Sequence, residues 1–138
     1  MTPKELMIGD WVKFTSKYGY GTGQIVGIEP KEGAVEPSTF TIHKRDKDGN
    51  TKLFIGVSRT CVKPIPLTDE ILKKNGFEYY HKNFASLSYD HPFRLKMVEW
   101  PDENGIGLWR MDGIIEIRFV HQLQHLLNLI GYDKEIVL

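Results

Sequence analysis

The sequence predicts an α+β fold, with a small β-barrel at residues 1–65 and, at residues 66–138, an antiparallel sheet covered by one helix. The first half contains four or five short runs of β-forming residues joined by glycine-rich turns, and it lacks helical periodicity. Two prolines, at positions 64 and 66, separate it from the second half. In the second half, the segment after Gly113 changes from a two-residue to a helical period.

The first half opens with a turn at Gly9-Asp10 that enters a strand, in which Val12 and Phe14 share one face. The alternating glycines at residues 19–23 predict a tight connection to a strand at residues 24–28. A phosphate-binding loop is the alternative for these glycines. It is disfavoured because such a loop opens a helix, whereas a β-branched strand follows here.

A β-hairpin is expected in the middle of the first half. Thr39–His43 and Lys52–Val57 flank Asp48-Gly49, a pair that supplies the positive backbone angles of a tight turn. Another short strand is expected at Arg59–Val62. The two prolines that follow should then end strand pairing, because proline has no N–H to donate.

The second half begins with a helix predicted at residues 69–75, for which Thr68 is the N-cap. Acidic residues occupy its first turn and lysines its last, as the helix dipole favours. Strands are expected at about residues 77–119, followed by a helix at 120–130 and a final strand at 135–138. The last strand before the long helix alternates apolar and charged residues, and the helix carries an apolar stripe formed by Val120, Leu123, Leu127 and Ile130.

The composition indicates what general class of protein this is. Hydrophobic residues make up 41% of the chain and charged residues 26%, which is typical of a globular protein. No apolar run approaches the roughly 18 residues of a membrane span, and the N-terminus lacks the apolar core of a signal peptide, so we expect a cytoplasmic protein that does not enter membranes. Cys61, the single cysteine, cannot form an internal disulfide and is expected to fill the core.

The net charge argues against a dedicated nucleic-acid binder. Eighteen basic residues balance eighteen acidic ones. Residues 1–66 carry ten Lys or Arg against seven Asp or Glu, a net of +3, and residues 67–138 carry eight against eleven, a net of −3. This mild asymmetry allows the first half to face an anionic partner, although ordinary solvated surface gives the same pattern.

The run Ile8-Gly9-Asp10-Trp11-Val12, followed by Gly19, Gly21, Gly23, Ile25 and Ile28, resembles the opening of SH3-like or Tudor-like barrels. Among these it is most similar to barrels of bacterial transcription- and repair-associated proteins such as the CarD family. The resemblance covers about 25 residues and implies an SH3-like barrel for the first half. It carries over no partner-binding residue, because the matched positions are turn glycines and core aliphatics.

A second resemblance covers nearly the whole chain. The run Pro64-Ile-Pro-Leu-Thr-Asp-Glu-Ile-Leu72 with Asn75-Gly-Phe77, and Val120-His-Gln-Leu-Gln124 before Leu129-Ile-Gly131, are similar to small uncharacterised proteins encoded by gut anaerobic bacteria and their phages. The resemblance implies an accessory protein of phage or mobile-element origin and names no activity.

The sharpest candidate for chemistry is the pair His121 and His125. Histidines at i and i+4 share a helix face and can ligate a metal, with the spacing of the zincin His-Glu-x-x-His motif. Gln122 stands where that motif has its general base, so peptide hydrolysis by that mechanism is not supported. A third ligand would come from a distant carboxylate or from His43, His81 or His91. The competing interpretation is a polar helix face whose histidines are exposed or hydrogen-bonded.

Aromatic residues suggest the contact surface. Trp11 and Trp109 are expected in the core, whereas Tyr18, Tyr20 and His43 are the candidate binding residues by analogy with other small barrels. The function expected from the sequence is non-catalytic binding of a protein partner or of nucleic acid, with no cofactor. The alternative is a metal-dependent enzyme that uses the histidine pair.

Overall fold

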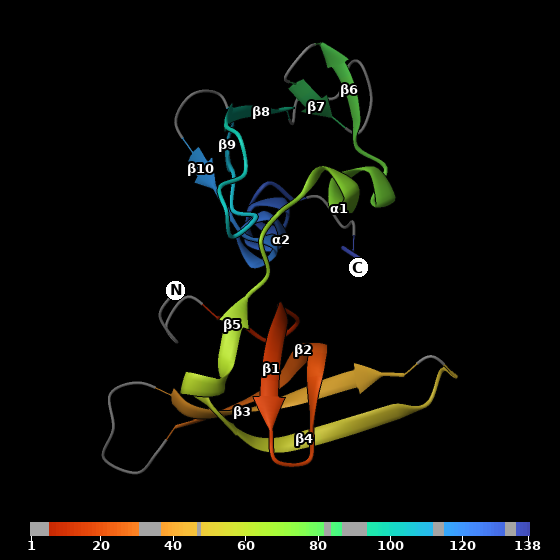
Figure 1. Ribbon diagram of the computed structural model, residues 1–138, viewed down its shortest axis with the longest axis vertical. Coiled ribbons are helices and arrows are strands. Elements are labelled where there is room, and N and C mark those ends of the chain that lie inside the picture. The colour runs from red at the N-terminus through yellow and green to blue at the C-terminus, as the bar shows by residue number, and fades with distance from the viewer. Residues whose placement is uncertain are drawn as a thin grey trace. The chain divides into compact units, whose positions relative to one another are not determined.

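The computed structural model describes residues 6–30, 37–46, 48–81, 84–86, 94–111, 115–131 and 135–138 (Figure 1). The chain divides into two compact units, Met1–Ile65 (unit 1) and Pro66–Leu138 (unit 2). Each unit contains one five-stranded antiparallel sheet, and two α-helices belong to unit 2. The α+β class expected from the sequence is therefore confirmed. Neither helix of the described residues has the length and apolarity needed to cross a membrane.

Unit 1 is an antiparallel meander whose last strand returns to the first. Its strands are β1 (Trp11–Ser16), β2 (Gly19–Pro30), β3 (Pro37–Arg45), β4 (Thr51–Ser58) and β5 (Val62–Pro64), in the spatial order β4-β3-β2-β1-β5. The hairpin of β3 and β4 around Gly49 was predicted correctly.

The sheet of unit 1 is strongly curved. Strands β4 and β5 lie at its opposite edges, yet only a 3₁₀ helix at Arg59–Cys61 joins them. The four residue steps from Ser58 to Val62 span at most about 14 Å, whereas the edges of a flat five-stranded sheet lie about 19 Å apart. The rings of Phe14 in β1 and Phe54 in β4 accordingly meet with centroids 4.8 Å apart. The described ladders do not close the sheet, so a closed barrel is not shown.

The core of unit 1 lies on the concave face of this sheet. Val12 and Phe14 are buried, as their shared face predicted, and Cys61 packs against the core as a half-buried filler. Trp11 is only half-buried, which corrects its expected place in the core. The buried cluster comprises Leu6, Val12, Phe14, Ile25, Phe40, Ile42, Phe54, Val57 and Val62.

Two local expectations for unit 1 were wrong. The glycines at residues 19–23 lie inside β2 and do not form a connection, because the turn falls earlier, at Lys17-Tyr18. Arg59–Cys61 forms a 3₁₀ helix instead of starting a strand, since the chain has to cross between the two edges of the sheet there. Strand pairing includes Lys63 and Pro64 before it ends at Pro64, because an edge strand needs no proline N–H on its outer side.

Unit 2 contains a second meander. Its strands are β6 (Glu78–His81), β7 (Phe84–Ser86), β8 (Arg94–Glu99), β9 (Leu108–Met111) and β10 (Ile115–Ile117), in the order β10-β9-β8-β7-β6. Helix α1 (Asp69–Lys74) precedes the sheet and is capped by the Thr68 hydroxyl, which accepts from Ile71 N. Helix α2 (Val120–Leu129) follows β10, as the change of period predicted.

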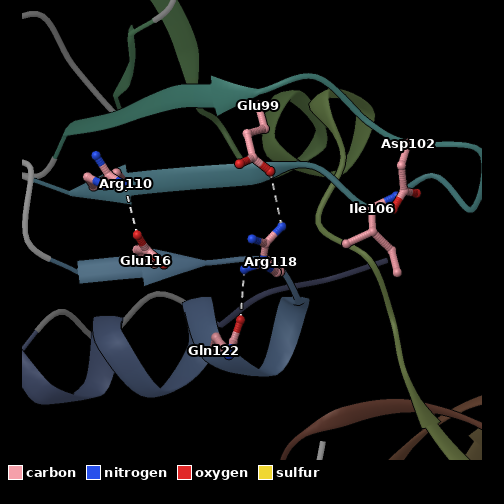
Figure 2. A network of polar contacts seen from close by, with 7 residues as sticks. All are labelled: Glu99, Asp102, Ile106, Arg110, Glu116, Arg118 and Gln122. Carbon is pink, nitrogen blue, oxygen red and sulfur yellow. Dashed lines mark hydrogen bonds and ion pairs between the residues drawn. The ribbon is translucent and has the colours of Figure 1, made fainter.

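Charged residues of β8, β9 and β10 pair with one another (Figure 2). Arg110 of β9 binds Glu116 of β10 at 2.8 Å, and Arg118 lies 3.5 Å from Glu99 of β8. The Gln122 side chain of α2 accepts from the backbone N–H groups of Arg118 and Phe119, at 2.7 and 3.1 Å. This amide joins the end of β10 to the first turn of α2, where two otherwise unsatisfied donors need a partner.

The final strand expected at residues 135–138 does not form. The buried side chain of Asn75 takes the place of a strand partner: its Oδ1 accepts from Val137 N at 2.8 Å, and its Nδ2 donates to Val137 O at 2.7 Å. Nδ2 also donates to Ile71 O at 2.8 Å. The Asn75 side chain therefore hydrogen-bonds both backbone groups of Val137 and joins the tail to α1.

Candidate functional site

The exposed tyrosines of unit 1 lie where β1 passes into β2: Tyr18 is in the turn and Tyr20 is in the second position of β2. Tyr18 and Tyr20 are 71% and 74% exposed, which is unusual for large aromatic side chains that have a core nearby. The Ser16 hydroxyl fixes the turn, since it donates to Gly19 O at 2.9 Å and accepts from Tyr18 N at 3.2 Å.

The alternation of glycine and tyrosine decides which way the rings point. A Cβ at Gly19 would lie 2.9 Å from the Phe54 ring, and one at Gly21 would lie 2.7 Å from Lys44 Nζ. At Gly19 the Phe54 ring leaves no room for a side chain, whereas at Gly21 the lysine could move and the positive φ of +140° is what favours glycine. Because successive strand residues point to opposite faces, the tyrosine of this stretch is directed to the solvent side.

Lysines surround the two rings and fix their backbone. Lys44 Nζ donates to Tyr20 O at 2.6 Å, and Lys52 Nζ donates to Tyr18 O at 3.5 Å. Ammonium groups also lie over one face of each ring: Lys17 Nζ is 5.0 Å from the centroid of Tyr18 and Lys44 Nζ is 5.9 Å from that of Tyr20. The turn therefore presents each aromatic ring next to a positive charge.

Two pairs of lysines lie directly opposite each other in the ladders. Lys13 of β1 is in register with Lys63 of β5, and Lys44 of β3 is in register with Lys52 of β4. Like charges at directly opposed positions destabilise a sheet. Within the described residues no carboxylate forms an ion pair with any of these four lysines or with Lys17.

Two adjoining grooves lie beside these side chains. The first, of about 670 Å³, runs between the end of β1 with its turn (residues 15–18) and β4 (residues 52–58). The second, of about 480 Å³, is lined by Lys13, Tyr20 and Lys63 among others. Thr15 and Cys61 line both grooves, and among the described residues no Asp or Glu lines either. We call the residues beside them the lysine–tyrosine surface: Lys13, Lys17, Tyr18, Tyr20, Lys44, Lys52 and Lys63.

The structure separates His43 from the other predicted binding residues. His43 is half-buried in β3, in register with Gln24 of β2 and Leu53 of β4, and it does not line either groove. Gln24 lies four residues beyond Tyr20 along β2, a distance of roughly 13 Å. Tyr18 and Tyr20 are thus brought to one surface, and His43 is not part of it.

The predicted metal ligands lie in α2 of unit 2. The rings of His121 and His125 have centroids 5.6 Å apart, and His121 also stacks on Phe119 at 6.0 Å. The competing interpretation was a polar face whose histidines are exposed or hydrogen-bonded; His121 is only 1% exposed, so the first of these options does not hold for it. In the part of the chain described, no group of three or more potential ligands could hold a metal ion. His91 and the side chain of His81 lie outside the described residues, so metal binding stays a prediction.

Unit 2 also contains a tyrosine, Tyr79, whose pKa is strongly raised. Burial raises the pKa of the Tyr79 phenol well above its usual range, and the hydrogen bond it donates to Asp69, with the negative charge of that carboxylate, raises it further. The Tyr79 ring packs near buried Trp109, with centroids 6.3 Å apart. Trp109 lies in the core as expected. Because this tyrosine ties α1 to β6, we assign it a structural role.

The lysines of the surface were missed in the sequence, because their opposition depends on strand register. Lys13 and Lys63 are fifty positions apart in the chain and become neighbours only when β5 pairs with β1. The available signal was the absence of acidic residues between positions 11 and 28. In comparisons with protein-family models, curated proteins and solved structures, nothing matches this chain.

Proposed function

We propose that unit 1 is a non-catalytic recognition module that binds an anionic partner through the lysine–tyrosine surface. The observation that carries the proposal is that Lys13 faces Lys63 and Lys44 faces Lys52, while no described carboxylate forms an ion pair with them. The opposed Lys96 and Arg110 of unit 2 differ, because Arg110 has Glu116 as its partner. Each opposed pair costs the sheet up to about 1 kcal/mol. A bound anion placed between two ammonium groups removes that cost and gains two attractive interactions.

The fold of unit 1 supports a barrel of the SH3-like type. The meander returns its last strand to the first, and a three-residue 3₁₀ helix brings the two sheet edges toward each other. Small barrels of this kind expose turns and sheet edges that serve as binding surfaces. We also propose an accessory protein of phage or mobile-element origin, which is what the resemblance of the sequence to small proteins of gut anaerobic bacteria and their phages implies.

The charge arrangement favours a partner that is itself charged. Apolar side chains line part of the first groove, including Phe54, Ile55 and Val57, but lysines stand at both of its sides. Burying an ammonium against a neutral partner removes it from water without compensation. An anionic partner avoids this penalty, so its binding should weaken steeply as salt rises.

The test is retention of the full chain on immobilised heparin, a sulfated polyanion, under a salt gradient. We expect Lys13→Gln combined with Lys63→Gln to elute at clearly lower salt than the unmodified chain. The matched control is Arg45→Gln combined with Lys73→Gln, which removes the same charge from positions outside both grooves. Elution of the two double variants at the same salt concentration would refute the proposed surface.

A further inference from the structure

We infer that the anionic partner of unit 1 is a single-stranded nucleic acid, whose bases stack on Tyr18 and Tyr20 and whose phosphates bind the surrounding lysines. This inference rests on the proposed function and names its ligand class. It depends on a feature that anion binding alone does not require, namely two exposed aromatic rings set among the charges.

The rings have the exposure and the surroundings of a stacking platform. Each presents more than two thirds of its surface to solvent, and an ammonium group lies within 6 Å of each centroid. Single-strand binders combine these two elements, a positively charged track for the backbone and aromatic faces for successive bases. Every base offers a π-face, so such a surface has little sequence preference.

The rigidity of the turn supports stacking. The Ser16 hydroxyl and the ammonium groups of Lys44 and Lys52 hold the backbone that carries both rings. Lys44 and Lys52 are therefore positioning residues in part, because their ammonium groups already donate to carbonyls of the turn. Lys13, Lys17 and Lys63 are left as the direct phosphate contacts.

The two grooves offer a continuous track. Tyr18 and Lys17 line the first groove, and Tyr20 lines the second, together with the Lys13 and Lys63 pair. Because Thr15 and Cys61 line both, a strand whose base stacks on Tyr18 can continue past Tyr20 to the opposed lysines. A track of this kind suits a site of at least about four nucleotides.

A duplex fits this arrangement less well than a single strand. In a duplex the base faces are stacked on one another, so a tyrosine ring reaches them only after a base has been unpaired. An acidic peptide would satisfy the lysines but offers no planar partner for the rings. The rings therefore distinguish the three ligand classes.

The experiment measures fluorescence anisotropy of a labelled oligothymidylate of about twelve nucleotides with the full chain. A hairpin duplex of the same phosphate count and a polyglutamate peptide serve as competitors. The variants are Tyr18→Leu with Tyr20→Leu, and Tyr18→Phe with Tyr20→Phe, which keeps the rings. Trp100→Leu is the matched control, because Trp100 is also 74% exposed but belongs to unit 2.

We expect the leucine double variant to weaken binding of the oligothymidylate by at least about fivefold per ring lost. The phenylalanine variant and Trp100→Leu should bind as the unmodified chain does. In Lys13→Gln with Lys63→Gln, the slope of log affinity against log salt should fall by about 1.4, since each phosphate contact to a single strand contributes about 0.7.

Equal affinity of the leucine and phenylalanine variants would overturn the inference, as would stronger competition by the duplex or the polyglutamate. If the oligothymidylate does not bind while heparin does, the single-strand assignment fails and the proposed function stands. If neither binds in a salt-dependent way, the proposed function itself fails. Circular dichroism of each variant shows that its fold is retained.

Discussion

The sheets of the two units have the same number of strands and the same antiparallel pairing, but they differ in whether opposed like charges have an acidic partner. In unit 2 Arg110 faces Lys96 of β8, yet Arg110 also forms an ion pair with Glu116, and Arg118 lies near Glu99. In unit 1 lysine faces lysine, at Lys13–Lys63 and Lys44–Lys52. Opposed like charges without an acidic partner destabilise a sheet, and this difference is the reason we propose that unit 1 binds an anionic partner.

The largest expected effect on stability comes from a buried polar side chain of unit 2, Asn75. Asn75→Ala removes one amide that makes three hydrogen bonds and leaves both backbone groups of Val137 without that partner. We expect a loss of about 2 kcal/mol in the free energy of unfolding. Urea unfolding measures the loss, and hydrogen exchange should assign it to residues 66–138.

Asn128→Ala is the matched control for this variant, because Asn128 is an exposed residue of α2. Its expected effect is within about 0.5 kcal/mol. A similar loss in both variants would mean that the amide of Asn75 is not what holds the tail.

The next effect tests the hydrogen bond between Tyr79 and Asp69. The pKa of Tyr79 is raised in the folded protein, so its contribution to stability is complete below the ordinary tyrosine pKa of about 10. Above that pH the unfolded chain loses the phenolic proton while the folded chain keeps it. The stability of unit 2 should therefore fall as pH rises beyond about 10.

Tyr79→Phe removes this pH dependence together with the hydrogen bond, at a cost of about 1 kcal/mol near neutral pH. Chemical unfolding of both proteins between about pH 8 and pH 11 gives the comparison. The assignment would be wrong if the variant lost stability with pH as steeply as the unmodified chain.

A smaller effect of opposite sign is expected in unit 1. Lys13→Glu turns the opposed pair with Lys63 into an attractive one, so the variant should gain about 0.5 kcal/mol of stability at low salt. The same substitution should weaken retention on heparin. Thermal unfolding at low and high salt checks the gain, and a loss of stability at low salt would show that the opposition is not a cost.

The smallest effect on stability is expected when an ion pair of unit 2 is removed. Glu116→Gln removes the partner of Arg110, and both side chains are partly exposed. We expect a loss of a few tenths of a kcal/mol that disappears at high salt. No change in retention on heparin should accompany it, and a change would locate part of the anion-binding surface in unit 2.

Much of the fold could be predicted because its signals are local. The hydroxyl of Thr68, the Asp48-Gly49 pair and the change of period before Val120 each act within a few residues of the structure that they specify. The tail at residues 135–138 has the composition of a strand, but its partner is the side chain of Asn75, more than sixty positions earlier. Composition does not reveal such a partner.

The candidate site shows the same limit. Tyr18 and Tyr20 were found from their own turn, whereas the lysine pairs follow from the register of strands that are distant in the chain. His43 was chosen for its closeness to a hairpin in the sequence and lies apart from both grooves. The two tyrosines could therefore be predicted from neighbouring residues, whereas the lysine pairs around them could be found only once the strand pairing was known.

The two lysine tethers on the turn of Tyr18 and Tyr20 have a consequence for the speed and strength of recognition. When a loop becomes ordered only on binding its ligand, the entropy lost in ordering the loop lowers the affinity. The two lysine contacts restrict the turn during folding, so the anionic ligand that we propose would dock on a surface that is already partly ordered.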